Sequence, residues 1–328
     1  MRLMTWALAI AMASTACGAT SEADGPLVVY SGRSEELVGP LIEQFENESG
    51  IDVEIRYADS SELAATLLAE GEETEADVFF AQDPASLGGA AGLMSQLPEE
   101  TLDLVDARFR DRDGRWVGTS GRVRVVVHNT GSDLPLPETI DDAVDPAWAG
   151  QLGVAPTNGS FLAFVSAMIL ERGEDRTRDW LEALAANNPV EFDGNAPIVE
   201  ATDTGELGGG LVNHYYLLRL RAEGQGNNTE NHFIPAGDVG SLVMPAGVGV
   251  MAATQHPEAA QQFVDFLLAE EAQTFFATET FEFPLIEGVP QPEGVPPLSE
   301  IAAPDIDLSE LAGVLDLATR LVAEAGLV

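Results

Sequence analysis

The stretch Gly210-Leu-Val-Asn-His-Tyr-Tyr-Leu-Leu-Arg-Leu220 joins a short apolar run to a segment whose leucines have helical spacing. The apolar residues are expected to end a buried strand, and Asn213, a good N-cap residue, is expected to start a helix. Tyr215 and Tyr216 then lie in the first helical turn, where several backbone N–H groups lack intrahelical partners. The stretch therefore predicts a strand that runs directly into a helix.

The adjacent Tyr215 and Tyr216 are candidate metal ligands. The partial positive charge at a helix start favours anions, so it is expected to lower the pKa of a phenol there. Tyrosinate is a hard oxygen donor that ligates ferric iron in haem proteins, and two phenolates suit a hard, highly charged cation. The alternative is that one tyrosine packs in the core and the other lies on the surface. An isolated Tyr-Tyr pair does not decide between these interpretations.

The same strand-to-helix pattern occurs near the start of the chain. Apolar runs and alternating segments predict strands at 27–30, 51–57 and 76–80, and helices at about 34–47 and 60–70. Strands that alternate with helices at this spacing imply parallel βαβ units. Ligands bind such sheets beyond the carboxyl ends of the strands, so the loops that follow Tyr30 and Phe80 are the candidate binding loops.

The rest of the chain predicts a second lobe. A long strand at 122–129 is expected to cross into it, and short strands at 241–245 and 247–251 are expected to return. One long helix is expected at 258–277, and a last helix from about Ser309.

The chain has 328 residues, which can bury enough core for two lobes. We therefore expect an α/β fold in which residues 26–122 and 246–296 form the first lobe and residues 123–245 and 297–328 form the second. Hinge strands would join the two lobes.

The charge of the chain excludes some partners. Its 55 acidic residues outnumber 15 basic residues, all of them arginine, and the formal net charge is −40. A surface of this kind repels nucleic acid and anionic lipid. The apolar content of 45% is ordinary for a globular protein, so the acidic excess does not indicate disorder.

The N-terminus resembles a bacterial lipoprotein signal. Arg2 precedes the apolar run 3–12, which is too short to span a bilayer as a mature helix, and Ser14-Thr-Ala-Cys17 resembles a lipobox with serine in place of the usual leucine. We expect residues 1–17 to be the signal peptide, Cys17 to be lipidated, and residues 18–25 to be a tether. The protein would then be extracytoplasmic and anchored to the cell membrane. The alternative is a buried thiol in an N-terminal helix.

The remaining motifs do not predict an enzyme. The sequence has no HExxH, zinc-type Cys/His spacing, GxSxG, P-loop or post-strand GxGxxG motif, and no nucleophile–base constellation is evident. His214 adjoins the tyrosines, but its place on a helix is expected to direct it elsewhere, in a supporting or hinge role. His128 ends the crossing strand and could approach a cleft, although a hydrogen-bonded core histidine is the commoner case.

Six stretches resemble, in order, the bacterial extracytoplasmic ferric-iron-binding proteins, which are substrate-binding components of ABC transporters. They cover the mature chain nearly end to end: Val29-Tyr-Ser-Gly-Arg-Ser-Glu-Glu36, Ala76-Asp-Val-Phe-Phe-Ala-Gln82, Asp193-Gly-Asn-Ala-Pro197, Val212-Asn-His-Tyr-Tyr216, Met244-Pro-Ala-Gly-Val-Gly249 and Glu282-Phe-Pro-Leu-Ile-Glu-Gly288.

The resemblance implies a two-lobed periplasmic-binding-protein type II fold with hinge strands and a ligand cleft between the lobes. It implies that Tyr215 and Tyr216 are phenolate ligands of Fe³⁺ and that an ABC transporter permease is the partner of a monomeric protein. It also implies a synergistic anion, carbonate or phosphate, at positions that match Arg33, Asn158, Gly159, Ser160, Asn195 and Asn213; a helix N-terminus at 158–160 fits anion binding.

Two departures leave the cargo open. Some relatives have a histidine ligand where Ser34 stands and a glutamate ligand where Gln82 stands, and others have a tyrosine near the position of Ser160. Fe³⁺ with two phenolates keeps one positive charge, which a bidentate anion can neutralise. The alternative cargo is an iron chelate, an oxyanion or a small organic solute.

The alternative to an anion contact for Arg33 is an exposed ion pair with Glu35 or Glu36.

Overall fold

The computed structural model describes residues 25–327. The expected signal peptide, the lipidation site Cys17 and residues 18–24 of the tether therefore lie outside the described residues. Within the described part, no helix is both long enough and apolar enough to cross a membrane.

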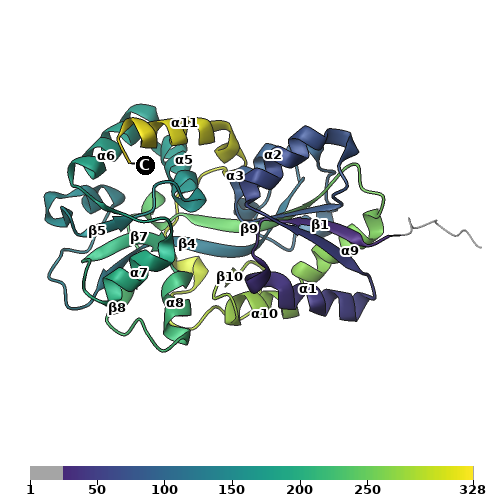
Figure 1. Ribbon diagram of the computed structural model, residues 1–328. Coiled ribbons are helices and arrows are strands. Elements are labelled where there is room, and N and C mark those ends of the chain that lie inside the picture. Colours follow the sequence, from purple (N-terminus) through teal and green to yellow (C-terminus); the bar gives the residue numbers. More distant parts are fainter. Residues whose placement is uncertain (1–24, 328) are drawn as a thin grey trace, which may run out of the picture.

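In the described residues, ten strands form one sheet that runs through both halves of the molecule (Figure 1). The order is β2-β1-β3-β9-β4-β7-β5-β6, and β8 and β10 also pair with β4. The strands are β1 (Leu27–Ser31), β2 (Val53–Tyr57), β3 (Val78–Ala81), β4 (Val117–Asn129), β5 (Leu152–Val154), β6 (Val190–Glu191), β7 (Gly209–Asn213), β8 (Thr229–His232), β9 (Val243–Val250) and β10 (Phe283–Pro284).

Helices cover both faces of this sheet (Figure 1). The helices are α1 (Glu35–Ser49), α2 (Ser60–Glu70), α3 (Pro84–Ala90), α4 (Glu99–Leu102), α5 (Gly159–Arg172), α6 (Glu174–Ala186), α7 (Asn195–Asp203), α8 (Tyr215–Ala222), α9 (Pro257–Leu267), α10 (Glu270–Thr278) and α11 (Leu311–Glu324). β1 pairs in parallel with β2 and with β3, which confirms the βαβ units predicted near the start of the chain.

Strand β4 joins the two lobes. Its residues from Val117 to Val123 pair with β9 on the side of the first lobe, and those from Arg124 to His128 pair with β7 of the second. Because one 13-residue strand belongs to both halves of the sheet, it is a hinge strand. The two-lobed α/β architecture is confirmed, whereas the assignment of residue ranges to the lobes stays a prediction.

Several predicted boundaries differ from the structure. The single helix expected at 258–277 is wrong: the chain is extended at Ala269, which separates α9 from α10. Buried Gln273 donates to the Leu267 carbonyl at 2.8 Å, so a side chain satisfies the end of α9 at the break. The two strands expected around residue 246 are instead one strand, β9.

The helix after the tyrosine-bearing strand starts one position later than predicted. Asn213 is the last residue of β7 and pairs with Arg124, and His214 occupies the N-cap position of α8. The His214 N–H donates to the Val123 carbonyl at 2.9 Å, which extends the ladder by one residue beyond Asn213. The expectation that Asn213 caps the helix is therefore wrong.

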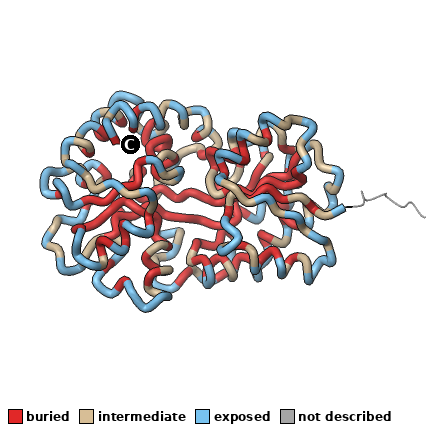
Figure 2. The backbone as a smooth tube through the Cα atoms, in the orientation of Figure 1, coloured by how far each residue is buried: buried red, intermediate tan, exposed pale blue. Residues whose placement is uncertain are grey.

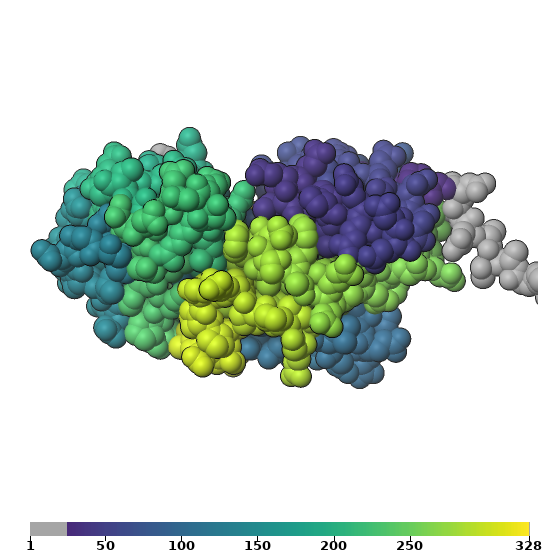
Figure 3. Space-filling model, turned by 90° about the horizontal axis from the view of Figure 1, so that it is seen from below, coloured from purple at the N-terminus to yellow at the C-terminus, as the bar shows by residue number. Residues whose placement is uncertain are grey.

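The sheet is the centre of the hydrophobic core (Figure 2). All residues of β3, β7 and β9 are buried. The last helix, α11, packs against α5 of the second lobe and α3 of the first, and Leu311 at its start is fully buried. Seen from below, the segment that follows α10 lies across the junction between the purple first lobe and the green second lobe (Figure 3).

Candidate metal and anion site

A cleft of about 560 Å³ is lined by both lobes. Its first-lobe wall includes Ser34 and Gln82, from the two loops that the sequence predicts to bind ligand. Its second-lobe wall includes the start of α5, at Asn158, and the start of α8, at Tyr215 and Tyr216. The predicted binding loops thus meet in one cleft, beyond the carboxyl ends of β1 and β3.

The two tyrosines lie together in the first turn of α8, as predicted. Their rings stack with centroids 4.3 Å apart and planes inclined by 26°. Tyr215 is buried, whereas Tyr216 is half-buried. The alternative, in which one tyrosine packs in the core and the other lies on the surface, does not account for the pair, because both residues line the cleft.

The protonation of Tyr215 differs from the expectation. Burial raises the pKa of the Tyr215 phenol well above its ordinary value, and the neighbouring Tyr216 raises it further. The positive charge of Arg122 acts in the opposite direction but does not prevail. The prediction that the helix start lowers the pKa is therefore wrong for Tyr215 in the metal-free chain, because desolvation outweighs the helix dipole. A cation that binds this phenol has to displace its proton.

The predicted anion-binding residues of the second lobe lie close together. The Asn158 side chain caps α5: its Oδ1 accepts from the Ser160 N–H at 3.0 Å and from the Ser160 hydroxyl at 2.6 Å. Asn195 donates to Asn158 Oδ1 at 3.3 Å. Asn195 and Asn213 are buried, and the Oδ1 of each has no hydrogen-bond partner among the described residues. With Gly159 these residues form one polar patch in or beside the cleft; their role in anion binding stays a prediction.

Arg33 is not the surface residue of its alternative interpretation. It is 1% exposed and pairs with Glu282, with Nη1 at 3.0 Å from Oε1 and Nη2 at 2.6 Å from Oε2. The hydroxyls of Ser120 and Thr280 each donate to Glu282 Oε2 at 3.0 Å. The predicted anion contact of Arg33 is not tested by this geometry, but both terminal nitrogens are directed to a carboxylate of the chain itself.

Glu282 is fully buried with this arginine. Burial alone would raise the pKa of the Glu282 carboxyl, but the charge and hydrogen bonds of Arg33, the charge of Arg122 and the Thr280 hydroxyl together hold it below its usual range. The carboxylate is therefore ionised at neutral pH, and the Arg33–Glu282 pair is a true ion pair.

Two arginines of the hinge strand were missed by the sequence interpretation. Arg122 and Arg124 are 1% and 0% exposed, and because they alternate with valines along β4 they point to the same face of the sheet. Arg122 lines the cleft and donates through Nη2 to the Gln82 carbonyl. Arg124 donates to the Ser160 hydroxyl at 3.3 Å and to the Leu211 carbonyl at 3.1 Å. The alternation of polar and apolar residues from Ser120 to Arg124 is the sequence signal that could have revealed these two arginines.

The histidines lie away from the expected metal position. His214 is buried: its Nδ1 accepts from the Val123 N–H at 3.2 Å and its Nε2 lies 2.9 Å from the Phe281 carbonyl. Burial lowers the pKa of His214 to about 4, so this imidazole is neutral and links the hinge strand to the segment before Glu282. His128 does not line the cleft; its ring faces His232 with centroids 6.5 Å apart.

The first-lobe wall offers few metal ligands. Ser34 and Gln82 line it as expected, and its carboxylates are Asp59 and Asp83. Both oxygens of Asp83 accept from Ser86, at 2.8 Å from its N–H and 2.9 Å from its hydroxyl. Across the described chain, no group of three or more His, Cys, Asp or Glu residues is placed to hold a metal. The tyrosines are therefore the strongest candidate ligands.

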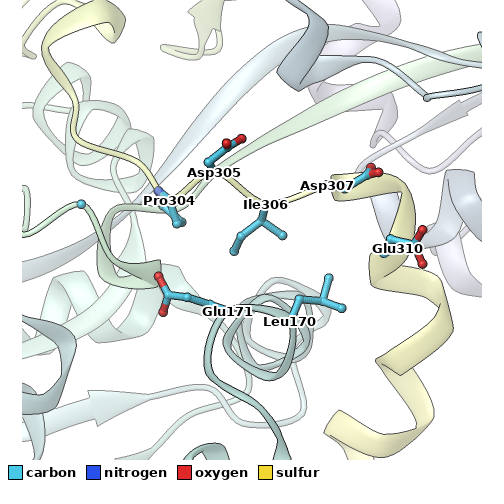
Figure 4. Close-up of a pocket in the computed structure, with 8 residues that line it drawn as sticks. Leu170, Glu171, Pro304, Asp305, Ile306, Asp307 and Glu310 are labelled. Atoms are coloured by element: carbon cyan, nitrogen blue, oxygen red, sulfur yellow. The ribbon is translucent and has the colours of Figure 1, made fainter.

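A second, acidic pocket is lined by neither the tyrosine pair nor the polar patch (Figure 4). It has a volume of about 420 Å³ and lies between the end of α5 and the segment 304–310. Arg112 pairs with both Asp307 and Glu310, and Arg172 lies 3.7 Å from Glu171. Arginines thus lie against three of its four carboxylates, and only Asp305 has no salt bridge with a described residue.

The fold and the cleft between the lobes define a two-lobed solute-binding protein. Residues 74–307 match the family of bacterial extracellular solute-binding proteins, and the chain belongs to that family. Its resemblance to the ferric-iron-binding members is confirmed by the relatives it matches over nearly its whole length.

The chain is 31% identical over 314 residues to the Fe(3+)-binding periplasmic protein of Serratia marcescens, covering 94% of this chain and 92% of that protein. It is 29% identical over 332 residues to the major ferric iron-binding protein of Neisseria meningitidis, covering 99% and 100% of the two chains. Among solved structures, iron-bound HitA from Pseudomonas aeruginosa superposes with a TM-score of 0.85 at 32% identity, covering 92% of this chain and 99% of HitA.

Proposed function

We propose that this protein captures ferric iron with Tyr215 and Tyr216 and delivers it to the permease of an ABC transporter. The observation that carries the proposal is the stacked tyrosine pair at the start of α8, in a cleft lined by both lobes. Phenolates are hard donors that suit a hard trivalent cation. The names of the relatives, which are ferric-iron-binding proteins, support the same cargo.

A synergistic anion, carbonate or phosphate, completes the site in this proposal. Ferric iron with two phenolates keeps one positive charge, and the first-lobe wall has Ser34 and Gln82 in place of charged ligands. The polar patch of residues 158–160 with Asn195 and Asn213 is the proposed contact surface for that anion. Arg33 stays a proposed anion contact: its two terminal nitrogens pair with Glu282, and its buried Nε has no hydrogen-bond partner among the described residues.

The proposed setting is extracytoplasmic. Lipidation at Cys17 would anchor the protein to the cell membrane, and the relatives are named as periplasmic or iron-binding proteins. We propose that it acts as a monomeric carrier, without enzymatic activity, beside its permease. Mass spectrometry of the membrane-extracted protein tests the anchor: a diacylated N-terminal cysteine supports it, and an unmodified Cys17 refutes it.

Iron uptake tests the function. The metal-free protein is loaded from a weak ferric chelate, desalted and analysed for iron, and its affinity is measured by competition with chelators. The wild type is expected to retain a single ferric ion per chain. Tyr215→Phe and Tyr216→Phe are each expected to weaken binding by more than about 100-fold, the upper limit for loss of an outer-sphere partner. Tyr57→Phe, a tyrosine outside the cleft lining, is the matched control and should retain its iron.

A second candidate is a carrier of a ferric chelate, an oxyanion or a small organic solute. The neutral side chains of Ser34 and Gln82 at the cleft favour it, since they offer hydrogen bonds rather than metal ligands. Calorimetry of the metal-free protein with small organic solutes distinguishes the candidates. Tight binding of such a solute, together with no retention of ferric iron, would establish the second candidate.

A further inference from the structure

Two histidines that do not line the cleft lie side by side at the second-lobe end of the hinge strand. His128 is the next-to-last residue of β4, and His232 is the last residue of β8. The antiparallel register places His232 opposite Val126, two positions before His128, so the two side chains emerge from the same face of the sheet. Both histidines are partly exposed, so dissolved ions can reach them.

The rings of this histidine pair, His128 and His232, face each other. Their centres are 6.5 Å apart and their planes are inclined by 81°. Imidazole nitrogens bind an ion such as Zn²⁺ at about 2.0–2.1 Å, so two rings that share one ion have centres about 4.5–6.4 Å apart. A small rotation of either side chain therefore brings one nitrogen of each ring to a common ion.

The surroundings of His232 prepare it to act as a ligand. Its Nε2 lies 2.7 Å from the carbonyl oxygen of Pro137, a distance at which the Nε2–H group donates to that oxygen. The proton is then on Nε2, and the lone pair of Nδ1 is free. Histidines that bind metals usually make such a bond with their second ring nitrogen, because it fixes both the tautomer and the orientation of the ring.

The charges around the histidine pair favour a cation. Burial lowers the pKa of His128, as does the neighbouring His232, and a backbone hydrogen bond with Asn129 acts in the opposite direction but does not prevail. The imidazole of His128 is therefore neutral at pH 7. Glu230 lies directly across from His128 and pairs with Arg221 at 2.9 Å, so it balances that guanidinium. The formal net charge of −40 also concentrates cations near the surface of the chain.

We propose that His128 and His232 form a second metal site, outside the cleft, which binds a divalent late transition ion such as Cu²⁺ or Zn²⁺ with water completing the coordination sphere. Neutral imidazole suits these ions, whereas the phenolates of the cleft suit the harder Fe³⁺. The site therefore does not depend on the proposed ferric cargo. Within residues 25–327 no group of three potential carboxylate, histidine or cysteine ligands is placed to hold a metal, so the site has two protein ligands.

The test uses Cu²⁺ as the probe, because this ion binds a given nitrogen site more tightly than other divalent first-row ions do. One equivalent is added to the metal-free, tag-free protein, and the affinity is measured by competition with a weak chelator. Electron spin echo modulation counts the imidazoles that bind copper. This signal distinguishes the histidine pair from the cleft, whose lining contains no histidine. Wild type is expected to hold one Cu²⁺ ion with two imidazoles.

The variants are His128→Gln and His232→Gln. Each is expected to weaken copper binding by at least about 10-fold, because even the loss of an outer-shell partner of a metal ligand costs about 10–100-fold. Copper that still binds these variants should show one imidazole instead of two.

The matched control is His256→Gln. His256 is also a partly exposed histidine, but its Nδ1 lies 3.1 Å from Asp77 in the first lobe. Its replacement should leave both the affinity for copper and the two-imidazole signal unchanged. Thermal unfolding without metal shows whether each variant is folded.

The outcomes separate this inference from the proposed function. Copper that binds wild type without imidazole would overturn the inference, even if the protein retains ferric iron at the tyrosines. Equal affinity and an equal signal in wild type and either folded variant of the pair would also overturn it. Loss of the two-imidazole signal in His128→Gln and His232→Gln, but not in His256→Gln, would support it, even if the protein binds no iron and the proposed cargo is wrong.

Discussion

The buried ion pair of Arg33 and Glu282 gives a quantitative prediction for the substitution Glu282→Gln. Glutamine keeps the shape of the side chain and can still accept from the hydroxyls of Ser120 and Thr280, but it leaves the guanidinium of Arg33 charged and unpaired inside the protein. Removal of one partner from a buried ion pair typically lowers the free energy of unfolding by about 3–5 kcal/mol. At about 2–3 °C per kcal/mol for a chain of this size, the melting temperature should fall by about 6–15 °C.

The pH dependence gives the same prediction a second readout. The folded-state pKa of Glu282 lies below its usual value, so the pair stabilises the protein fully at neutral pH, and this stabilisation is lost as the pH falls through the folded-state pKa. The difference in melting temperature between wild type and Glu282→Gln should therefore be constant near pH 7 and shrink below about pH 4.

Calorimetric unfolding of the metal-free proteins across this pH range is the assay. Asp103→Asn is the control, because it removes one partner of an exposed pair with Arg110 and should cost no more than about 1 kcal/mol. A fall of less than about 2 °C for Glu282→Gln at pH 7 would refute the reasoning, since that is below 1 kcal/mol for this chain. A difference that persists unchanged at pH 3 would refute the assignment of the charge to Glu282.

Three further predictions concern the cleft. Ferric affinity should fall by at least about 10-fold per unit of decreasing pH, because the metal displaces the proton of the Tyr215 phenol, whose pKa is raised by burial; chelator competition would show this, and an affinity independent of pH contradicts phenolate ligation. Iron with anion should draw the lobes together about β4, so small-angle scattering should show a smaller radius of gyration, and an unchanged radius contradicts closure. Gly32→Ala should destabilise the protein by about 1–3 kcal/mol in thermal unfolding, because a Cβ there would lie 1.9 Å from Ser60 Oγ; unaltered stability contradicts this packing.

Much of the architecture could be predicted because local patterns and tertiary structure agree. The apolar runs of β1 and β3 and the intervening amphipathic helices specify parallel βαβ units, and Gly50 ends α1 with a left-handed φ of 72°. The tyrosines could be placed in a first helical turn because a buried strand runs directly into α8.

Long-range contacts explain what could not be predicted. The local sequence of Arg33 offers Glu35 and Glu36 as partners, which was the alternative to an anion contact, whereas its actual partner Glu282 lies 249 positions away in the sequence. The burial of Arg122 follows from a hinge strand flanked by β9 and β7, a pairing that the sequence of β4 does not specify. Its alternation with valines nevertheless indicated a polar face in a buried strand. The pKa of Tyr215 depends on burial beside residues far away in the sequence, such as Arg122 and Glu282, which local helix geometry does not reveal.

The central claim is that phenolate oxygens of the tyrosine pair hold the ferric ion. Resonance Raman spectroscopy of the iron-loaded protein, excited in its visible absorption band, tests this most directly. We predict tyrosinate vibrations in the wild type, weaker ones in Tyr215→Phe and Tyr216→Phe, and none in the double variant. A wild-type protein that retains ferric iron but shows no tyrosinate vibrations would contradict the account.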